Sequence, residues 1–406
     1  MPGRGFFRAL LLGLLGLLAL AFSVIATAQV VRIDQLPPGP LGSRALYLQE
    51  QAGSPPLTLA QARAALQRGE FHRDERAIAG FGLRARPVWA YLELQNPLDD
   101  ALALRLIAGM SWIDRLEVVQ VKGDQVLASW NSGDEAGPVD GAANLVPGQG
   151  FVFPLAVPSG RSEIWIRAQT VDPLVLPLGL QLAAQAPADE RGIHYAYGLL
   201  YGFLLALIAY NTMLYAGLRQ GSYLYYACYL LSFIGLNLAY TGHGFAWWWP
   251  DSAHFQRYVN LVMMVVFGAA GIAFADHFLD LRQRARRLRQ WLLGAAVAAL
   301  LAQALCLAAD WHGLAVWIAF VFLLGCSLGL LLLGIWAYRR RLPAARYFLA
   351  AVAFGMGGSS LTTLAVWGLL PMTALSFHGV EFGVLVEAVL LALALASHLR
   401  SHERAR

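Results

Sequence analysis

The residues from 193 to 217 read IHYAYGLLYGFLLALIAYNTMLYAG and include no Asp, Glu, Lys or Arg. A helix of about 20 apolar residues spans the hydrocarbon core of a bilayer, so this stretch predicts a transmembrane helix. Six similar stretches follow it. The seven predicted spans lie near 193–217, 222–241, 257–278, 290–309, 314–338, 346–368 and 376–398. Residues 191–399 are therefore predicted to form a bundle of seven membrane-spanning helices.

The composition agrees with a membrane protein. Charged residues make up 14% of the 406 residues, compared with about 25% in a typical soluble protein. The net charge of +5 is unevenly distributed, because residues 29–190 carry 13 basic and 18 acidic side chains, whereas residues 191–406 carry 15 and 7. The low fraction of charged residues excludes an ordinary cytosolic enzyme. The charge distribution also argues against a nucleic-acid partner, since the polar domain has a net negative charge.

The arginines predict how the chain is oriented. If residues 29–190 lie outside the membrane, thirteen arginines of the second half lie on the inner side, and only Arg191 and Arg257 lie on the outer side. Cytoplasmic segments are enriched in Lys and Arg, so the C-terminus, with a short basic tail at 400–406, is predicted inside. Eight arginines of two inner loops are a predicted docking surface for a cytoplasmic partner. They are Arg282, Arg284, Arg286, Arg287, Arg289, Arg339, Arg340 and Arg341.

Residues 1–28 have the features of a cleaved signal peptide. Arg4 and Arg8 precede an apolar run at 9–21, and Ala26-Thr27-Ala28 places small residues directly before Gln29. Residues 29–190 are therefore predicted to be exported.

The exported domain has the period-two pattern of β-strands. Leucines at 174, 176, 178, 180 and 182 alternate with residues such as Val175 that are predicted to face the other way. Pro, Gly and Asp turns separate several short runs of this kind, which predicts an antiparallel, all-β sandwich. One helix is expected to begin at Thr58, where Gln61 completes a capping box.

Two tryptophans and two charged residues are the candidate ligand-binding residues of this domain: Trp89, Trp112, Asp114 and Arg115. Sugar-binding sandwiches stack pyranose rings on aromatic side chains and bind hydroxyl groups through acidic residues or Arg. The alternative is that both tryptophans belong to the core, because a tryptophan in a strand buries a large area.

No metal site, cofactor or catalytic residue is predicted. Asp134, Glu135 and Asp140 lie in a Gly-rich loop, but their spacing differs from that of an EF-hand. The three cysteines, all in the membrane half, lack the spacing of a zinc site.

The segment Gly357-Gly358-Ser359-Ser360 loosely resembles an intramembrane serine protease, but small residues at helix contacts explain it. A retinal-binding light sensor is excluded, because its Schiff base needs a lysine in the bundle and the single lysine is Lys122.

Four polar residues of the predicted spans are candidate switch residues: Asn211, His378, Glu381 and Glu387. Polar and ionisable groups within a membrane are costly, which makes them functional candidates. Glu387 lies about 240° around the helix from Glu381, so the two carboxylates are not expected to pair. Three interpretations stay open: a proton- or ligand-responsive switch, packing residues that contact Asn211 or a backbone carbonyl, and a solute carrier. Against the carrier, seven spans do not divide into inverted repeats.

The order of leader, strand-rich domain and seven spans resembles the bacterial seven-transmembrane receptors with diverse intracellular signalling modules. The strand-rich domain is similar to the type 2 extracellular domain of that family. The motifs that carry the resemblance in the spans are Tyr210-Asn211-Thr212-Met213-Leu214-Tyr215, Tyr223-Leu224-Tyr225-Tyr226 and Glu387-Ala388-Val389-Leu390-Leu391-Ala392-Leu393-Ala394-Leu395-Ala396. Those in the strand-rich domain are Val88-Trp89-Ala90-Tyr91-Leu92-Glu93-Leu94-Gln95-Asn96 and Ile113-Asp114-Arg115-Leu116-Glu117-Val118.

The resemblance implies a multi-pass receptor in the bacterial inner membrane with a periplasmic, jelly-roll-like sandwich related to carbohydrate-binding modules. Such a receptor binds a small periplasmic ligand, with a carbohydrate as one candidate, and relays a conformational change through the seven helices. Family members usually continue into a signalling domain, whereas eight residues follow His398 here. The implied partner is therefore a separate cytoplasmic diguanylate cyclase or histidine kinase, unless the chain is a truncated product. A homodimer is compatible with the resemblance.

Overall fold

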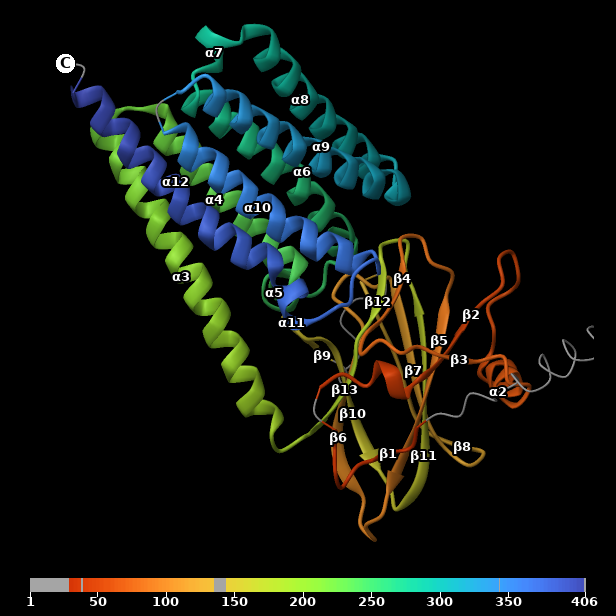
Figure 1. Ribbon diagram of the computed structural model, residues 1–406. Helices are drawn as coiled ribbons and strands as arrows, with labels where there is room; N and C mark the ends of the chain where they lie inside the picture. Colours follow the sequence, from red (N-terminus) through yellow and green to blue (C-terminus); the bar gives the residue numbers. More distant parts are fainter. Residues whose placement is uncertain (1–28, 38, 135–143, 343, 405–406) are drawn as a thin grey trace, which may run out of the picture.

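The computed structural model describes residues 29–37, 39–134, 144–342 and 344–404. All β-strands lie between Val31 and Leu182, and long helices follow from Ala186 onward. The β-domain sits at one end of the helical bundle (Figure 1). The predicted fold class, a sandwich followed by a seven-helix bundle, is confirmed. The predicted signal peptide, 1–28, lies outside the described residues.

The β-domain is a sandwich of two sheets. The larger has the order β3-β2-β5-β11-β7-β8, with β1 parallel to β5, and the smaller has the order β13-β6-β10-β9. A separate pair, β12 with β4, lies on the side of the bundle (Figure 1). The larger sheet comprises β1 (Val31–Arg32), β2 (Leu46–Gln49), β3 (His72–Arg73), β5 (Val88–Asn96), β7 (Arg115–Lys122), β8 (Gln125–Ser132) and β11 (Gly160–Gln169). The other strands are β4 (Ala79–Gly82), β6 (Leu102–Ala108), β9 (Asn144–Val146), β10 (Gly150–Val157), β12 (Leu174–Leu176) and β13 (Leu178–Leu182).

The core between the sheets follows the predicted alternation. Leu104 and Leu106 of β6 share one buried cluster with Ile164 of β11. The leucines from 174 to 182 form two strands rather than one, because Pro177 separates β12 from β13. Val175, predicted to face away from the core, is also buried, since that face of β12 packs against the bundle.

A helix covers the outer face of the larger sheet. Helix α2 (Leu59–Gln67) begins with the predicted capping box: the Gln61 N–H donates to Thr58 Oγ1 (3.3 Å) and the Thr58 N–H donates to Gln61 Oε1 (2.8 Å). Its buried face packs with Trp165 of β11. The larger sheet is therefore buried on both faces over this part of its area.

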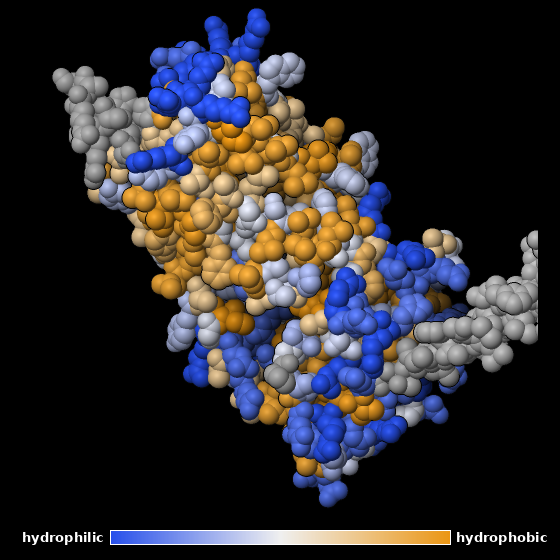
Figure 2. Space-filling model, in the orientation of Figure 1, coloured by the Kyte–Doolittle hydropathy of each residue, from blue (hydrophilic) through white to orange (hydrophobic). Residues whose placement is uncertain are grey.

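Seven helices of the described residues are long and apolar enough to cross a membrane. They are α3 (Ala186–Leu218), α4 (Gly221–Tyr240), α6 (Ala253–Phe278), α8 (Arg286–Ala308), α9 (His312–Arg339), α10 (Ala345–Val366) and α12 (Gly379–Arg404). Short helices between them are α5 (His243–Trp247), α7 (Leu281–Arg284) and α11 (Ala374–Phe377). Figure 2 shows hydrophobic residues over the middle of the bundle and hydrophilic ones on the sandwich and at the far end of the bundle.

The connection from sandwich to bundle is short. Only residues 183–185 separate β13 from α3. Arg105 of β6 forms an ion pair with Glu190 near the start of α3. The smaller sheet is thus held to the first helix by a side-chain contact as well as by the chain.

Glycines bring α10 and α12 into backbone contact. A Cβ added at Gly358 of α10 would lie 2.2 Å from the carbonyl oxygen of Gly379 and 2.9 Å from the Cα of Gly383. Small residues allow helices in a membrane to approach this closely. The Gly-Gly-Ser-Ser segment of α10 therefore serves helix packing at this position.

Candidate functional site at the junction of sandwich and bundle

Two of the loops of the sandwich that meet the bundle carry the candidate residues. The loop 109–114 joins β6 to β7, and the loop 170–173 joins β11 to β12. Gly109, with φ of +73°, begins the first loop, and the Ile113 N–H donates to the Met110 carbonyl (3.1 Å) within it. The first loop contributes apolar side chains to the contact with the helices, and both loops also make polar contacts there. The buried cluster that joins the two parts consists of Met110, Trp112, Val175, Ala365, Val366 and Met372.

Aromatic rings connect the first loop to the last helices. Trp112 stacks on Tyr240 at the end of α4, with ring centroids 5.4 Å apart, and its Nε1–H donates to the Pro173 carbonyl (3.0 Å). The Ser111 hydroxyl donates to the Tyr240 carbonyl (2.9 Å). On its other side Tyr240 stacks on Phe377 of α11, again at 5.4 Å. The rings thus form an uninterrupted contact from the sandwich to the segment that precedes α12.

A buried hydrogen bond connects the second loop to α9. Asp172 Oδ2 lies 2.9 Å from Nε2 of His312, the first residue of α9. Tyr258 of α6 packs edge-on against the imidazole. Both partners are almost fully buried, so the contact is shielded from solvent.

Two further carboxylates lie beside this pair. Asp114 Oδ2 accepts a hydrogen bond from the Val171 N–H (2.8 Å), whereas its Oδ1 has no hydrogen-bond partner among the described residues. The Asp134 N–H donates to the Ile113 carbonyl (2.8 Å), which brings this side chain next to Asp114, and its Oδ1 is likewise without a hydrogen bond there. Both side chains are buried.

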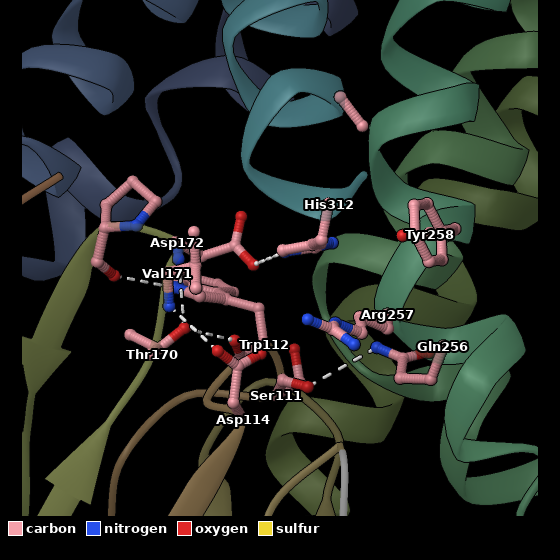
Figure 3. A network of polar contacts seen from close by, with 12 residues as sticks. Ser111, Trp112, Asp114, Thr170, Val171, Asp172, Gln256, Arg257, Tyr258 and His312 are labelled. Carbon is pink, nitrogen blue, oxygen red and sulfur yellow. Dashed lines mark hydrogen bonds and ion pairs between the residues drawn. The ribbon is translucent and has the colours of Figure 1, made fainter. Parts of the chain in front are cut away.

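The cluster brings several carboxyl groups close together in a buried part of the junction. Asp114, Asp172 and His312 each offer one ligand atom, and these atoms all lie within 4.8 Å of one another. Figure 3 shows them facing one another, with the Arg257 guanidinium reaching toward the cluster from α6. Burial and the neighbouring Asp172 raise the pKa of Asp114, although the charges of His312 and Arg257 oppose the shift. Burial and the two other carboxylates raise the pKa of Asp134 further.

The structure separates the four predicted ligand-binding residues of the sandwich. Trp112 and Asp114 both lie at the junction, but the ring of Trp112 is stacked and buried. Trp89 is buried in the cluster under α2 and donates from Nε1 to Glu50 Oε1 (2.9 Å). Arg115 is exposed at the start of β7. Neither tryptophan offers an open ring face on which a sugar could stack.

Glu381 lies in a polar chain within the bundle. The Asn237 Nδ2–H donates to Glu381 Oε1 (3.0 Å), the Tyr201 hydroxyl donates to Asn237 Oδ1 (2.8 Å), and His378 Nδ1 lies 3.8 Å from Glu381 Oε1. Asn211, expected as a carboxylate partner if the glutamates are packing residues, instead donates to the Leu207 carbonyl of its own helix (2.8 Å). Asn237 is a polar residue of the second predicted span and, with Asn211, Glu381 and Glu387, motivates the carrier interpretation. The sequence could not predict its contact with Glu381, because the two residues lie on different helices.

Glu387 has a different environment. Its carboxylate lies over Gly355 of α10, where an added Cβ would be 2.2 Å from Oε2. It lines a cavity of about 40 Å³ together with Tyr229 and Ser359. A second cavity of about 100 Å³ runs from Trp112 and Asp172 to Asn237 inside the bundle. The two glutamates do not pair, as predicted from their helical spacing.

The predicted docking arginines lie in α7, at the start of α8 and at the end of α9, away from the sandwich (Figure 1). Seven of them are exposed. Arg289 differs, because its Nε–H donates to both carboxylate oxygens of Asp276 (3.0 and 2.9 Å). Its charge is therefore partly neutralised within the bundle.

The sequence did not reveal the partners Asp172 and His312. They are 140 positions apart, and neither belongs to a local motif. Their only sequence signal is that each sits at the boundary of a strand or helix, where loops of both parts can meet.

Two family models match the chain. The model described as 7TM diverse intracellular signalling matches residues 193–398, and the model described as 7TMR-DISM extracellular 2 matches residues 43–181. No curated protein matches significantly. The two matches cover the bundle and the sandwich in the order that the structure gives them. The chain belongs to the seven-transmembrane receptors with diverse intracellular signalling modules, with the type 2 extracellular domain of that family.

Proposed function

We propose that this membrane receptor is a sensor of the bacterial inner membrane whose periplasmic sandwich responds to a small ligand, with a carbohydrate as one candidate. The response passes through the junction to the helices. A separate cytoplasmic signalling enzyme, a diguanylate cyclase or a histidine kinase, reads it at the arginine-rich end of the bundle.

The observation that carries this proposal is the ring contact from Trp112 through Tyr240 to Phe377. A ligand shifts a receptor only by binding one of its conformations better than another. Because α11 directly precedes α12, a conformation that moves Trp112 also changes the packing at the start of the last helix.

The arginines support the proposed orientation. The exposed members of the set lie at the end of the bundle opposite the sandwich, and basic residues are enriched on the cytoplasmic side. Exposed guanidinium groups also suit an acidic partner surface. Arg289 is left out of the proposed docking surface because it pairs with Asp276.

The proposal is tested in the bacterium that encodes the chain. The gene is deleted and then restored as wild type, Trp112→Ala or Trp112→Phe, and cyclic dinucleotide levels and protein phosphorylation are measured. Deletion and Trp112→Ala are expected to change the same output, whereas Trp112→Phe retains a ring and restores much of it. Trp130→Ala is the matched control, because Trp130 packs on Phe153 within the sandwich.

A solute carrier is the competing function. In that case a labelled solute enters cells only when the chain is present, and Glu387→Gln abolishes uptake. Uptake of this kind, together with unchanged cyclic dinucleotides and phosphorylation after deletion, contradicts the receptor mechanism.

A further inference from the structure

We propose that Asp114, Asp172 and His312 bind one divalent transition-metal ion of the zinc class, which joins the sandwich to the start of α9. This inference does not depend on the ligand or the output of the receptor. It assigns a site to residues that come from three separate segments of the chain.

The distances suit one ion. The three ligand atoms lie within 4.8 Å of one another. Ligands about 2.1 Å from a tetrahedral zinc ion are roughly 3.4 Å apart, so side-chain rotations of about 1 Å close the site. Asp172 Oδ2 and His312 Nε2, at 2.9 Å, move apart by about 0.5 Å to reach that spacing. The ion takes the place of the proton between these two atoms.

Unsatisfied atoms around the cluster point to a missing partner. Asp114 is 3% exposed and Asp134 is 1% exposed. The Oδ1 atom of each lacks a hydrogen bond from any described residue. A buried polar atom without a partner is costly, and a buried charge is more so. A bound cation removes that cost for Asp114 directly. Asp134 or a water molecule completes the coordination.

The local charge also calls for a cation. Asp114 and Asp172 face one imidazole and the guanidinium of Arg257 (Figure 3). The buried carboxyl group of Asp134 lies next to Asp114. Metal binding requires deprotonated ligands, and with the carboxyl groups deprotonated an additional divalent charge brings the cluster near neutrality. The arginine lies beside the ligand atoms and offsets part of the charge without ligating.

The donor types select the metal. One imidazole with carboxylates is typical of Zn²⁺ and of other first-row divalent ions, whereas Ca²⁺ and Mg²⁺ prefer oxygen ligands alone. All three ligand residues are buried. The cluster therefore resembles a structural site more than a catalytic one, which keeps an open position.

The test uses the full chain in nanodiscs. The protein is stripped with a chelator, dialysed against Zn²⁺ or Co²⁺, and assayed for bound metal and for its thermal unfolding midpoint. One ion per chain and a higher midpoint are expected for the wild type, since a ligand that binds only the folded state stabilises it. Visible absorption of the Co²⁺ form reports imidazole and carboxylate coordination.

Conservative variants keep the experiment decisive. Asp114→Asn and His312→Gln keep size and polarity, and each is expected to weaken Zn²⁺ by more than the roughly 10–100-fold typical of a lost outer-shell contact. His254→Ala is the control, because His254 is exposed and packs on the same Tyr258. Calcium and magnesium are expected to leave the midpoint unchanged.

Two results overturn the inference. One is less than 0.1 ion per chain at saturating Zn²⁺ in folded wild-type protein. The other is equal zinc affinity in the wild type and in both variants. Neither result bears on the cellular output assay with Trp112, so failure of the metal site and failure of the receptor mechanism are distinguishable.

Discussion

Trp112 of the sandwich and Tyr240 at the end of α4 are stacked, with their planes 17° from parallel. The two residues lie on opposite sides of the junction, and Tyr240 carries the contact on to Phe377. We therefore expect packing of the sandwich on the bundle to be coupled to the position of α11 and of the last helix.

Removal of the Trp112 ring is expected to loosen this coupling. Trp112→Ala deletes a buried aromatic side chain, a change that typically costs about 3–5 kcal/mol. Hydrogen exchange in the purified full chain is expected to increase in residues 374–380 as well as in the loop 109–114. Trp130→Ala, which acts within the sandwich, leaves exchange at 374–380 unchanged. Equal exchange in both variants contradicts the coupling.

The ion pair of Glu50 and Arg167 predicts an acid-sensitive sandwich. Arg167 Nε lies 2.8 Å from Glu50 Oε1 in a buried contact. Burial by itself raises the pKa of Glu50, but the hydrogen bonds and charge of Arg167, with those from Trp89 and Leu57, outweigh it and lower the pKa. The stabilisation is therefore complete above the ordinary value of 4.5 and disappears as pH falls through the lower, folded-state pKa.

Glu50→Gln tests that sign. The variant is expected to lose about 1.5–3 kcal/mol of stability at neutral pH, the usual contribution of a hydrogen bond to a charged group. Its unfolding free energy is expected to fall less steeply than that of the wild type below pH 4.5. Glu70→Gln, which alters an exposed pair with Arg68, changes neither quantity measurably. If the unfolding free energies of Glu50→Gln and the wild type fall equally steeply below pH 4.5, the ion pair is not the source of the acid sensitivity.

The contact between α10 and α12 gives a prediction with a neighbouring control. Gly358→Ala places a Cβ 2.2 Å from the Gly379 carbonyl oxygen, whereas Gly357→Ala meets nothing within 4 Å. Overpacking of this kind costs about 1–3 kcal/mol. The thermal midpoint in nanodiscs is expected to fall for Gly358→Ala and to stay the same or rise for Gly357→Ala. Similar midpoints for the two variants refute the close approach.

The polar chain around Glu381 predicts a difference between amide and apolar substitutions. Glu381→Gln keeps an oxygen that can accept from Asn237, so the bundle is expected to remain stable. Glu381→Leu leaves the amide of Asn237 without this partner and is expected to cost about 0.6 kcal/mol, the average for side-chain hydrogen bonds between membrane helices, and at most about 1.7 kcal/mol. Unfolding of both variants in mixed micelles measures the difference. A leucine variant as stable as the glutamine variant argues against the bond.

The sequence predicted elements well and contacts between elements poorly. Leu104 and Leu106 marked their strand because alternation is a local property, and Thr58 with Gln61 marked a helix start for the same reason. The prediction that Val175 faces away from the core missed its burial, because the surface that covers it belongs to a helix almost two hundred residues later. Trp112 and Asp114 were recognised as candidates, but their burial at the junction depends on the docking of two domains. His312 gave no signal, since a first helical residue becomes a partner of Asp172 only once both loops are in place.

The length of α3 has a mechanical consequence. Its 33 residues correspond to about 50 Å of helix at 1.5 Å per residue, whereas a bilayer core is about 30 Å thick. The helix is therefore about 20 Å longer than the hydrocarbon core, and its first turns are held to the smaller sheet through Arg105 and Glu190. Only residues 183–185 lie between β13 and α3. A connection this short does not let the sandwich move independently of the helix. Any movement of the sandwich is therefore expected to turn or tilt α3, with the docked loops as the pivot.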